Sequence, residues 1–484
     1  MIGAAHFKAL FEPEGVVVAG ASTHPGKFGF VSLHNLLRAG YSGRVYATNL
    51  AGETVLGIET VPSLADLPDG SFDLVFVCTP AKTNLELLEQ AHAKGAKALF
   101  LTSAGYGEAG AEGLAAQRAL VQRADELDML VAGPNGQGVV STPVDLCAQI
   151  VAPYPPKGNI GIASQSGNFV SSFMNYANAT GIGISRAVSA GNAAQVTVPD
   201  YLDFYADDPA TSVGLAYVEG ISDGRGFYER IRSIAQRMPL VLVKGGATEG
   251  GASAAASHTG ALAADDAVFD GMVRQAGAVR APTVESAYEI AATFATQPLP
   301  KGPRTCVLTT AGGWGVVTAD AISNSSLELA QLPDDLVAAI DQHLPPRWSR
   351  GNPVDLAGGE TRDTIPEVMR LIAEHPSIDA IVYLGLGIQS NQAEFMKTGR
   401  FYPDHGLERI VDFHERQDAR YAQAAADISA QTGKPILTAT ELAMSNPDNP
   451  GPATVRATGR VCYASANRAV TALDAMWRHA KRRA

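Results

Sequence analysis

The stretch NIGIASQSGNFVSSFMNYA, residues 159–177, decides the fold that we expect for this chain. An apolar run leads into a tight turn of small residues and then into a helical pattern. The stretch TCVLTTAGGWGVVTADAIS, residues 305–323, repeats this arrangement. Such a turn presents backbone N–H groups at a helix N-terminus, a common anion site, although small residues also let a strand and a helix pack closely. Two copies favour two phosphate sites, the first at Ser164, Gln165, Ser166, Gly167 and Asn168 and the second at Gly312, Gly313 and Gly315.

The first 150 residues alternate between strand and helix in the same way. Apolar runs rich in β-branched residues are separated by amphipathic segments such as KTNLELLEQAHAKG (82–95). This alternation is typical of a parallel sheet with helices on both faces. The predicted strands are GVVVAG (15–20), RVYAT (44–48), DLVFVCT (73–79), KALFLT (97–102) and MLVAG (129–133).

Two proline-rich segments divide the chain. They lie near 152–159 and 296–303, and a fresh apolar strand follows each. Because 484 residues are too many for one hydrophobic core, we expect three α/β domains at 1–150, 158–298 and 303–484. Residues 391–423 interrupt the third domain and are interpreted as an insertion that contains a helix, with no function assigned.

Charge and cysteine content exclude several classes of protein. The net charge of −12 disfavours a polyanionic partner such as nucleic acid, and the basic segment WRHAKRR (477–483) suits a helix C-terminus. The four cysteines lie far apart without a C-x-x-C pair, which argues against a zinc site or a disulfide framework and suits a reducing cytosol. Neither a signal peptide nor an apolar run of about 18 residues is found, so a cytoplasmic protein is expected.

The glycine-rich turn GVVVAGASTHPGKFGF (15–30) does not match a dinucleotide site. A G-x-G-x-x-G order is required, but Gly20 is followed by Ser22. The second strand should end in an acidic residue for the ribose hydroxyls, and it leads instead to Asn49. A different phosphate-bearing nucleotide is therefore predicted. Lys27 could meet a phosphate, although a solvated lysine is the common alternative.

A single histidine, His258, lies in the small-residue segment GGATEGGASAAASHTGALAADDAVFDG (245–271). It could be a structural histidine, a metal ligand or a nucleophile. No second ligand stands at metal-binding spacing nearby, whereas neutral imidazole is a competent nucleophile. A phosphoryl group on the ring would suit the two predicted helix N-termini. Glu219, at the end of the strand pattern VGLAYVEG (213–220), could fix the tautomer of the ring, or could simply be solvated.

These motifs together resemble those of the α subunit of NDP-forming acyl-CoA synthetases, the family of ADP-forming acetyl-CoA synthetase, and over the first two domains those of succinyl-CoA synthetase. SHTGALA resembles the phosphohistidine loop, YVEGISDGRGFYERIR the strand with the family's glutamate, and SQSGNF and GGWGVVTADA the two phosphate-binding helix starts. GASTHPGKFG, TPAKTN, SAGYGE and GPNGQG resemble CoA-binding loops. The CoA-binding residues implied are Gly20, Ser22, Thr23, Lys27, Phe28, Asn49, Thr79, Pro80, Ser103 and Asn135.

The resemblance implies a fold and a reaction. A Rossmann-like CoA-binding domain would be followed by two flavodoxin-like domains of the succinyl-CoA-synthetase kind. Acyl-CoA and phosphate would give acyl phosphate and CoA, His258 would take the phosphoryl group with help from Glu219, and ADP would receive it. The steps are reversible. The identity of the carboxylic acid is left open.

Two departures and one absence qualify this interpretation. The family usually has Asn-Pro-Lys after the second strand, whereas this chain has Asn49 without the lysine, which Lys27 could replace. Trp314 stands where a small residue is usual. No ATP-grasp region is found, which implies a separate subunit that binds ATP or ADP and Mg²⁺, by analogy in an α2β2 complex. The alternative is a CoA-binding regulatory or scaffold protein that has lost turnover; a serine hydrolase is excluded because Ser164, not glycine, stands two places before Ser166.

Overall fold

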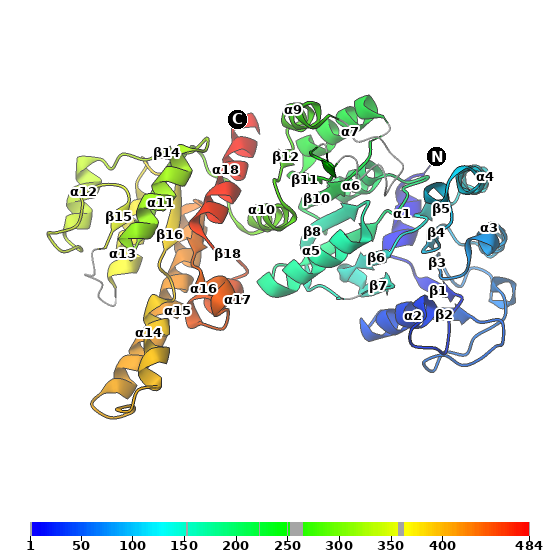
Figure 1. The fold of residues 1–484 in the computed structure, drawn as a ribbon, viewed down its shortest axis with the longest axis horizontal. Coiled ribbons are helices and arrows are strands. Elements are labelled where there is room, and N and C mark those ends of the chain that lie inside the picture. The colour runs from blue at the N-terminus through cyan, green and yellow to red at the C-terminus, as the bar shows by residue number, and fades with distance from the viewer. Residues whose placement is uncertain are drawn as a thin grey trace. The chain divides into compact units, whose positions relative to one another are not determined.

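Five buried apolar runs form a parallel sheet in the first part of the chain. The computed structural model describes residues 2–151, 153–221, 223–248, 250–251, 265–356 and 363–483. The sheet order is β2-β1-β3-β4-β5, and all five strands are parallel (Figure 1). All five predicted strands are therefore present, as β1 (Gly15–Ala19), β2 (Arg44–Thr48), β3 (Leu74–Val77), β4 (Ala98–Leu101) and β5 (Leu130–Ala132).

Helices connect these strands and cover the sheet. Strands β1, β3, β4 and β5 are buried along their whole length, which is why their sequences are continuous apolar runs and not alternating ones. The helices of this part are α1 (Ala4–Phe11), α2 (Phe28–Arg38), α3 (Asn84–Ala93) and α4 (Ala111–Glu126), with short 3₁₀ turns at Leu64–Asp66, Ala81–Thr83, Gly107–Ala109 and Thr142–Val144.

The second sheet repeats this topology. Its five parallel strands lie in the order β9-β8-β10-β11-β12, so the first strand again lies between the second strand on one side and the third on the other. The strands are β8 (Lys157–Ser164), β9 (Ile184–Ser189), β10 (Val213–Val218), β11 (Leu240–Lys244) and β12 (Val279–Arg280). The helices are α5 (Gly167–Thr180), α6 (Val198–Asp207), α7 (Gly224–Arg237) and α9 (Asp266–Ala276), and α10 (Val284–Thr296) follows β12 but belongs largely to the unit of the third sheet.

One hairpin lies in a different sheet from the one that the predicted boundary at residue 150 implies. Strands β6 (Gly138–Ser141) and β7 (Leu146–Gln149) fall within the range 1–150, yet β6 pairs antiparallel with β9 of the second sheet. The hairpin covers the edge that β9 would otherwise expose. Local sequence cannot reveal this pairing, because an apolar run of four residues fits the edge of either sheet.

The third sheet uses the same order for a third time. Strands β14-β13-β16-β17-β18 are parallel, and the short β15 pairs with the carboxyl end of β13. The strands are β13 (Arg304–Thr309), β14 (Glu328–Leu329), β15 (Val354–Asp355), β16 (Ala380–Leu384), β17 (Ile436–Ala439) and β18 (Cys462–Tyr463). The helices are α11 (Gly312–Ser323), α12 (Asp334–Asp341), α13 (Thr364–Glu374), α14 (Ile388–Lys397), α15 (Leu407–Thr432), α16 (Leu442–Ser445), α17 (Pro450–Ala457) and α18 (Ala466–Arg483).

The predicted insertion at 391–423 is part of a longer helical connection between β16 and β17. Helices α14 and α15 pack against each other as a hairpin (Figure 1). The second half of α15 belongs to the core of the third sheet, where Tyr421, Ala425 and Ile428 are buried. The predicted insertion is therefore part of an ordinary strand–helix–strand crossover. The polar residues that precede the buried half of α15 are the ones whose sequence suggested an insertion.

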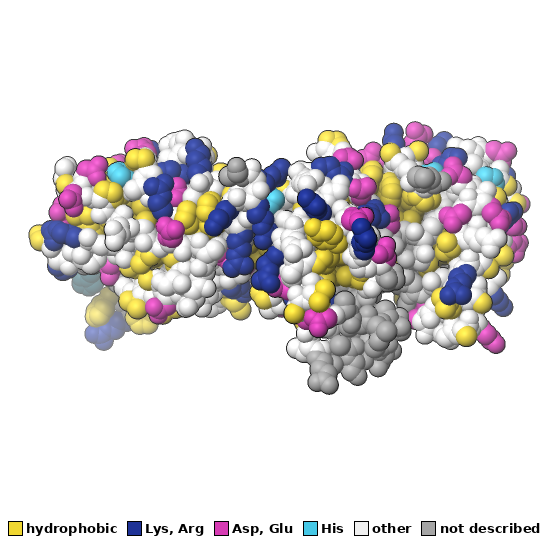
Figure 2. All heavy atoms as spheres, turned by 90° about the horizontal axis from the view of Figure 1, so that it is seen from above, with side chains coloured by type: hydrophobic (Ala, Val, Ile, Leu, Met, Phe, Trp, Pro, Cys, Tyr) yellow, Lys and Arg dark blue, Asp and Glu magenta, His cyan; other side chains and the backbone are white. Residues whose placement is uncertain are grey.

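The chain forms two compact units. The first contains residues 1–179 and 183–287, with the first two sheets, and the second contains residues 180–182 and 288–484, with the third sheet. Charged side chains of both signs are interspersed on the face drawn in Figure 2. Within the described ranges, no helix is long and apolar enough to cross a membrane.

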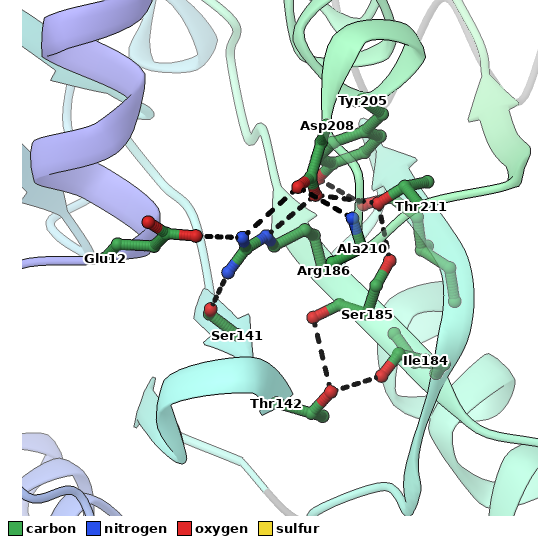
Figure 3. Close-up of polar contacts among 11 residues, drawn as sticks. Glu12, Ser141, Thr142, Ile184, Ser185, Arg186, Tyr205, Asp208, Ala210 and Thr211 are labelled. Carbon is green, nitrogen blue, oxygen red and sulfur yellow. Dashed lines mark hydrogen bonds and ion pairs between the residues drawn. The ribbon is translucent and has the colours of Figure 1, made fainter.

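A buried arginine on the second sheet forms ion pairs with residues that follow α1 and α6 (Figure 3). The side chain of Arg186, on β9, is 1% exposed and pairs with Asp208 at 3.0 Å and with Glu12. Its guanidinium also donates to the hydroxyl of Ser141 on β6. Because Glu12 follows α1 and Asp208 follows α6, this cluster fixes the N-terminal helix on the second sheet.

Candidate functional site

A large cavity lies in the first unit. Its volume is about 1220 Å³. The loops that follow β3, β4 and β5 of the first sheet line it, together with the loops that follow β8, β9 and β10 of the second sheet. In a doubly wound sheet, ligands bind at the carboxyl ends of the strands, near the point where the strand order reverses. The cavity meets this rule for both sheets at once.

Half of the predicted CoA-binding residues line this cavity. Phe28 begins α2 and is 54% exposed, Thr79 and Pro80 follow β3, Ser103 follows β4, and Asn135 follows β5. Ser103 accepts a hydrogen bond from the Asn84 side chain at 3.0 Å, and its carbonyl accepts the Asn135 N–H at 3.0 Å. The carboxyl edge of the first sheet therefore brings these residues together from four different loops.

The other five predicted CoA-binding residues do not line the cavity. Gly20 has a positive φ of 85°, and Gly29 packs so closely on its carbonyl that a Cβ at Gly29 would lie 2.0 Å from that oxygen. Asn49 is engaged in the fold, because its amide donates to the Ala21 carbonyl at 3.0 Å. The remaining three residues, Ser22, Thr23 and Lys27, belong to the partly or fully exposed turn between β1 and α2.

The first predicted phosphate turn lines the cavity. Gln165, Ser166, Gly167 and Asn168 all line the cavity, at or just before the start of α5. Ser164 is fully buried, and its hydroxyl donates to the Ser166 carbonyl at 2.7 Å and accepts the Ser166 N–H at 3.1 Å. Ser164 therefore shapes the turn, whereas its neighbours are the residues at the cavity.

Glu219 lies beside this turn. It follows β10, which pairs with β8 so that Tyr217 stands opposite Ser164, and it lines the same cavity. The side-chain amide oxygen of Gln165 accepts the N–H groups of Glu219 at 2.5 Å and Gly220 at 3.2 Å, and its NH₂ group donates to the Gly220 carbonyl at 3.1 Å. The predicted carboxylate and the predicted phosphate turn are thus neighbours in space, although 54 residues separate Gln165 from Glu219 in sequence.

His258 lies outside the described residues, so its place is not part of this geometry. The described chain breaks off shortly after β11 and resumes at Asp265, just before α9. At the first end, the Lys244 ammonium donates to the carbonyls of Gly245 and Gly246 at 3.3 and 3.0 Å, and it lies 3.8 Å from the Asp266 carboxylate at the other end. Lys244 and Asp266 therefore lie close together at the carboxyl end of β11.

The second predicted phosphate turn lies in the other unit. Gly312, Gly313 and Gly315 occupy the first turn of α11, and a Cβ at Gly312 would come within 2.6 Å of the Asp355 carboxylate. Trp314 between them is 39% exposed. A negatively charged side chain already lies near this helix N-terminus, in accord with the helix dipole.

Several polar residues at the cavity were not predicted individually. Glu108 and Gln137 fall within the motifs SAGYGE and GPNGQG, so those motifs could have pointed to them. Although burial raises the pKa of the Glu108 carboxyl, hydrogen bonds from Asn192 and from backbone N–H groups outweigh it and hold the pKa below its usual value. Arg230, on α7, pairs with Asp200 at 2.6 Å. No sequence pattern pointed to Arg230 or Asp200, because only the packing of α6 and α7 turns these two side chains toward the cavity.

Within the described residues, no group of three or more histidine, cysteine or acidic side chains is arranged to hold a metal ion. The four cysteines are free and distant from one another in sequence, and burial raises the pKa of each thiol. The polar groups at the cavity therefore include Glu219, the predicted phosphate turn, the loops of the first sheet and the side chains of Glu108, Asp200 and Arg230.

Three domain families match the chain in sequence. A CoA binding domain matches residues 14–142, a succinyl-CoA ligase like flavodoxin domain matches residues 157–294, and a ligase-CoA domain matches residues 305–389. The first match contains the first sheet, the second contains the five parallel strands of the second sheet, and the third ends after β16, before β17 and β18.

Curated and solved relatives cover most of the chain. It is 35% identical over 381 residues to the α subunit of acetate–CoA ligase [ADP-forming] I of Pyrococcus furiosus, covering 78% of this chain and 82% of that one. It is 33% identical over 389 residues to acetate–CoA ligase [ADP-forming] I of Archaeoglobus fulgidus, covering 80% of this chain but only 56% of that one. The structure of a dinucleotide forming acetyl-coenzyme A synthetase 1 from Ca. Korarchaeum cryptofilum, in complex with phosphate and ADP, matches with a TM-score of 0.84 and 29% identity, over 99% of this chain and 97% of that one.

Proposed function

We propose the function of this chain from one premise: the chain belongs to the family of ADP-forming acetate–CoA ligase α subunits and their fused relatives. It is a ligase that joins a carboxylic acid to CoA, and we assign to it the CoA-binding and phosphoryl-carrying half of the reaction. One observation carries this assignment. The cavity that collects the CoA loops of the first sheet also holds the phosphate turn at α5 and the Glu219 carboxylate.

The residues around the cavity fit CoA. The volume of about 1220 Å³ suits a long ligand, and the loops at the carboxyl edge of the first sheet supply hydroxyl, amide and backbone groups. Phe28, Thr79, Pro80, Ser103 and Asn135 would hold CoA inside the cavity. Gly20, Ser22, Thr23 and Lys27 would act at its rim, with Lys27 as the candidate for the phosphate contact that the family's lysine makes. Asn49 would contribute through the fold of the turn.

The chemistry proposed for this chain is a phosphoryl relay through His258. Phosphate held at Gln165, Ser166, Gly167 and Asn168 attacks the acyl carbon of acyl-CoA, the C–S bond breaks, and CoA leaves. A ring nitrogen of His258 then attacks phosphorus, and the bond from phosphorus to the acyl oxygen breaks to release the carboxylate. Glu219 accepts the N–H of the other ring nitrogen and fixes the tautomer. Transfer of the phosphoryl group to ADP completes the cycle, and every step is reversible.

The nucleotide half is assigned to a partner. The α subunit from Pyrococcus furiosus is named as one subunit of its enzyme, whereas this chain spans 56% of the fused relative from Archaeoglobus fulgidus. We propose an ATP-grasp subunit that binds ATP or ADP and Mg²⁺, in an α2β2 complex. Gly312, Gly313 and Gly315 would form a second phosphate site in the last of three domains. We propose 1–150, 158–298 and 303–484 as the boundaries of these domains.

Phosphoenzyme formation tests this function. The chain is mixed with its ATP-grasp partner, ATP and Mg²⁺, and acid-labile, base-stable phosphate is mapped by mass spectrometry. Label at His258 that a carboxylic acid and CoA discharge together is the expected result. His258→Asn should abolish the label while CoA affinity stays nearly unchanged. Absence of label in a complex that is shown to assemble and to bind CoA would instead support the regulatory alternative.

A further inference from the structure

The phenol of Tyr217 and the amide of Gln165 hold Glu219 from two sides. Tyr217 is the penultimate residue of β10, and its hydroxyl donates a hydrogen bond to the Glu219 carboxylate. Gln165 makes the three hydrogen bonds to the backbone of Glu219 and Gly220 described above, and its own N–H donates to the Tyr217 carbonyl at 3.2 Å. Side chain and backbone of the same carboxylate residue are thus both fixed.

The surroundings of Tyr217 keep the phenol in place. Its ring lies 4.2 Å from the Phe169 ring, centroid to centroid, and the residue is only 7% exposed. A Cβ at Gly245 would lie 2.3 Å from the phenol oxygen and 3.2 Å from Cγ of Glu219, so only glycine leaves room for the phenol–carboxylate pair there. Burial raises the pKa of Tyr217, and the charge of Glu219 raises it further. The phenol therefore remains an O–H donor throughout the neutral range.

We propose that Tyr217 and Gln165 are positioning residues of the phosphoryl relay, which act through Glu219. The inference rests on the proposed function and assigns Gln165 differently: its amide orients the carboxylate residue and is not a phosphate ligand. A carboxylate has about four acceptor sites, so one bond from a phenol still leaves capacity for the N–H of an imidazole. The phenol thus selects one orientation of the carboxylate without occupying it fully.

A double-mutant cycle tests this assignment in the assembled enzyme. Tyr217→Phe and Gln165→Met are measured alone and combined with Glu219→Gln, and the rate of His258 phosphorylation is recorded by rapid quench. Each single variant should lower that rate roughly tenfold to a hundredfold, as expected for lost bonds that orient a charged group. In the Glu219→Gln background the same changes should alter the rate by no more than about twofold, because coupled residues are not additive.

Matched variants separate positioning from simple structural damage. Tyr205→Phe removes another buried phenol of the same unit, whose hydroxyl donates to the Ile162 carbonyl at 3.0 Å, and it should leave the phosphorylation rate within about twofold of wild type. Gly245→Ala should reproduce the rate loss of Tyr217→Phe by displacing the phenol. The KM for phosphate should stay unchanged in Gln165→Met.

Three outcomes would overturn the inference while leaving the proposed function intact. Rate losses that persist undiminished in the Glu219→Gln background would show that the two residues act independently of the carboxylate. A raised KM for phosphate in Gln165→Met would return this residue to the phosphate site. An equal rate loss in Tyr205→Phe would reduce the effect to packing. By contrast, a wild-type enzyme without label at His258, or a Glu219→Gln enzyme with normal label, contradicts the proposed function itself.

Discussion

The junctions β8–α5 and β13–α11 share one pattern of hydrogen bonds but differ in the residues that the neighbouring strands place beside them. In both, the last residue of the strand has a fully buried hydroxyl, on Ser164 or Thr309, which donates to the carbonyl and accepts the N–H of the residue two places on. In both, the next residue, Gln165 or Thr310, bonds the neighbouring strand end. The repeated sequence pattern therefore corresponds to a repeated set of hydrogen bonds.

The difference lies on the neighbouring strand. Tyr217 stands opposite Ser164, and Leu384 stands opposite Thr309. Two residues further along, the first unit has Glu219 at the cavity, whereas the second unit has Leu386, which is fully buried. The comparison teaches that a strand–turn–helix junction supplies only a scaffold for an anion. The carboxylate beside the second junction is Asp355 of β15, which lies against Gly312 at the helix start, whereas Glu219 of the first unit lies at the cavity.

The largest effect is expected at Glu219 and Leu386, the two equivalent positions at which the junctions differ. Glu219→Gln keeps the shape of the side chain but removes the charge, and we expect phosphoenzyme formation to fall by roughly 10²- to 10⁴-fold, because the imidazole loses the carboxylate that fixes its tautomer. Leu386→Met at the equivalent position should leave this rate unchanged and lower the free energy of unfolding by less than about 1.5 kcal/mol. Quench-flow labelling and urea denaturation measure the two quantities; a similar loss of rate in both variants would remove the distinction.

A second substitution, at Arg186, is expected to destabilise the first unit alone. Arg186→Met leaves the buried Asp208 carboxylate without its cation, which typically costs about 3–5 kcal/mol. Hydrogen exchange should show lost protection in β8 and β9 and unchanged protection in β13 and β16, because the two units have separate cores. Equal losses in both sheets would mean that the units unfold as one.

The buried hydroxyls that both junctions share, on Ser164 and Thr309, are expected to contribute less to the free energy of unfolding. Ser164→Ala and Thr309→Val each remove a buried hydroxyl with two hydrogen bonds, so each should lower the free energy of unfolding by about 1–3 kcal/mol. Only Ser164→Ala should also slow phosphoenzyme formation, since its turn borders the cavity with Glu219. If Thr309→Val slowed the reaction as much, the second turn would take part in the same step.

The smallest effect concerns the glycines of the second turn. A Cβ at Gly313 meets no atom within 4 Å, and its φ is not positive, so Gly313→Ala should stabilise the second unit by about 0.4–1 kcal/mol. Gly312→Ala should destabilise it, because the new Cβ would press on the Asp355 carboxylate. Thermal unfolding distinguishes the two, and destabilisation by Gly313→Ala would indicate a close contact at that position.

The sequence determined the elements and their order. Continuous apolar runs identified β1 to β5, because strands buried on both faces need apolar side chains throughout. The two strand–turn–helix motifs correctly predicted the turns at the starts of α5 and α11, since small residues at a helix start leave a readable local pattern, and their role as phosphate sites remains our proposal. Glu219 was marked by its place at the end of a strand, and the carboxyl ends of parallel strands meet at one edge of a sheet.

Only the tertiary structure decided which groups meet. It placed β6 and β7 on the second sheet, directed the Asn49 amide into the turn after β1, and turned Gln165 toward the backbone of Glu219. These outcomes depend on strand register and on residues 28 to 54 positions apart in sequence. Local pattern reports burial and backbone conformation, whereas the partner of a polar side chain is set by which strands lie side by side.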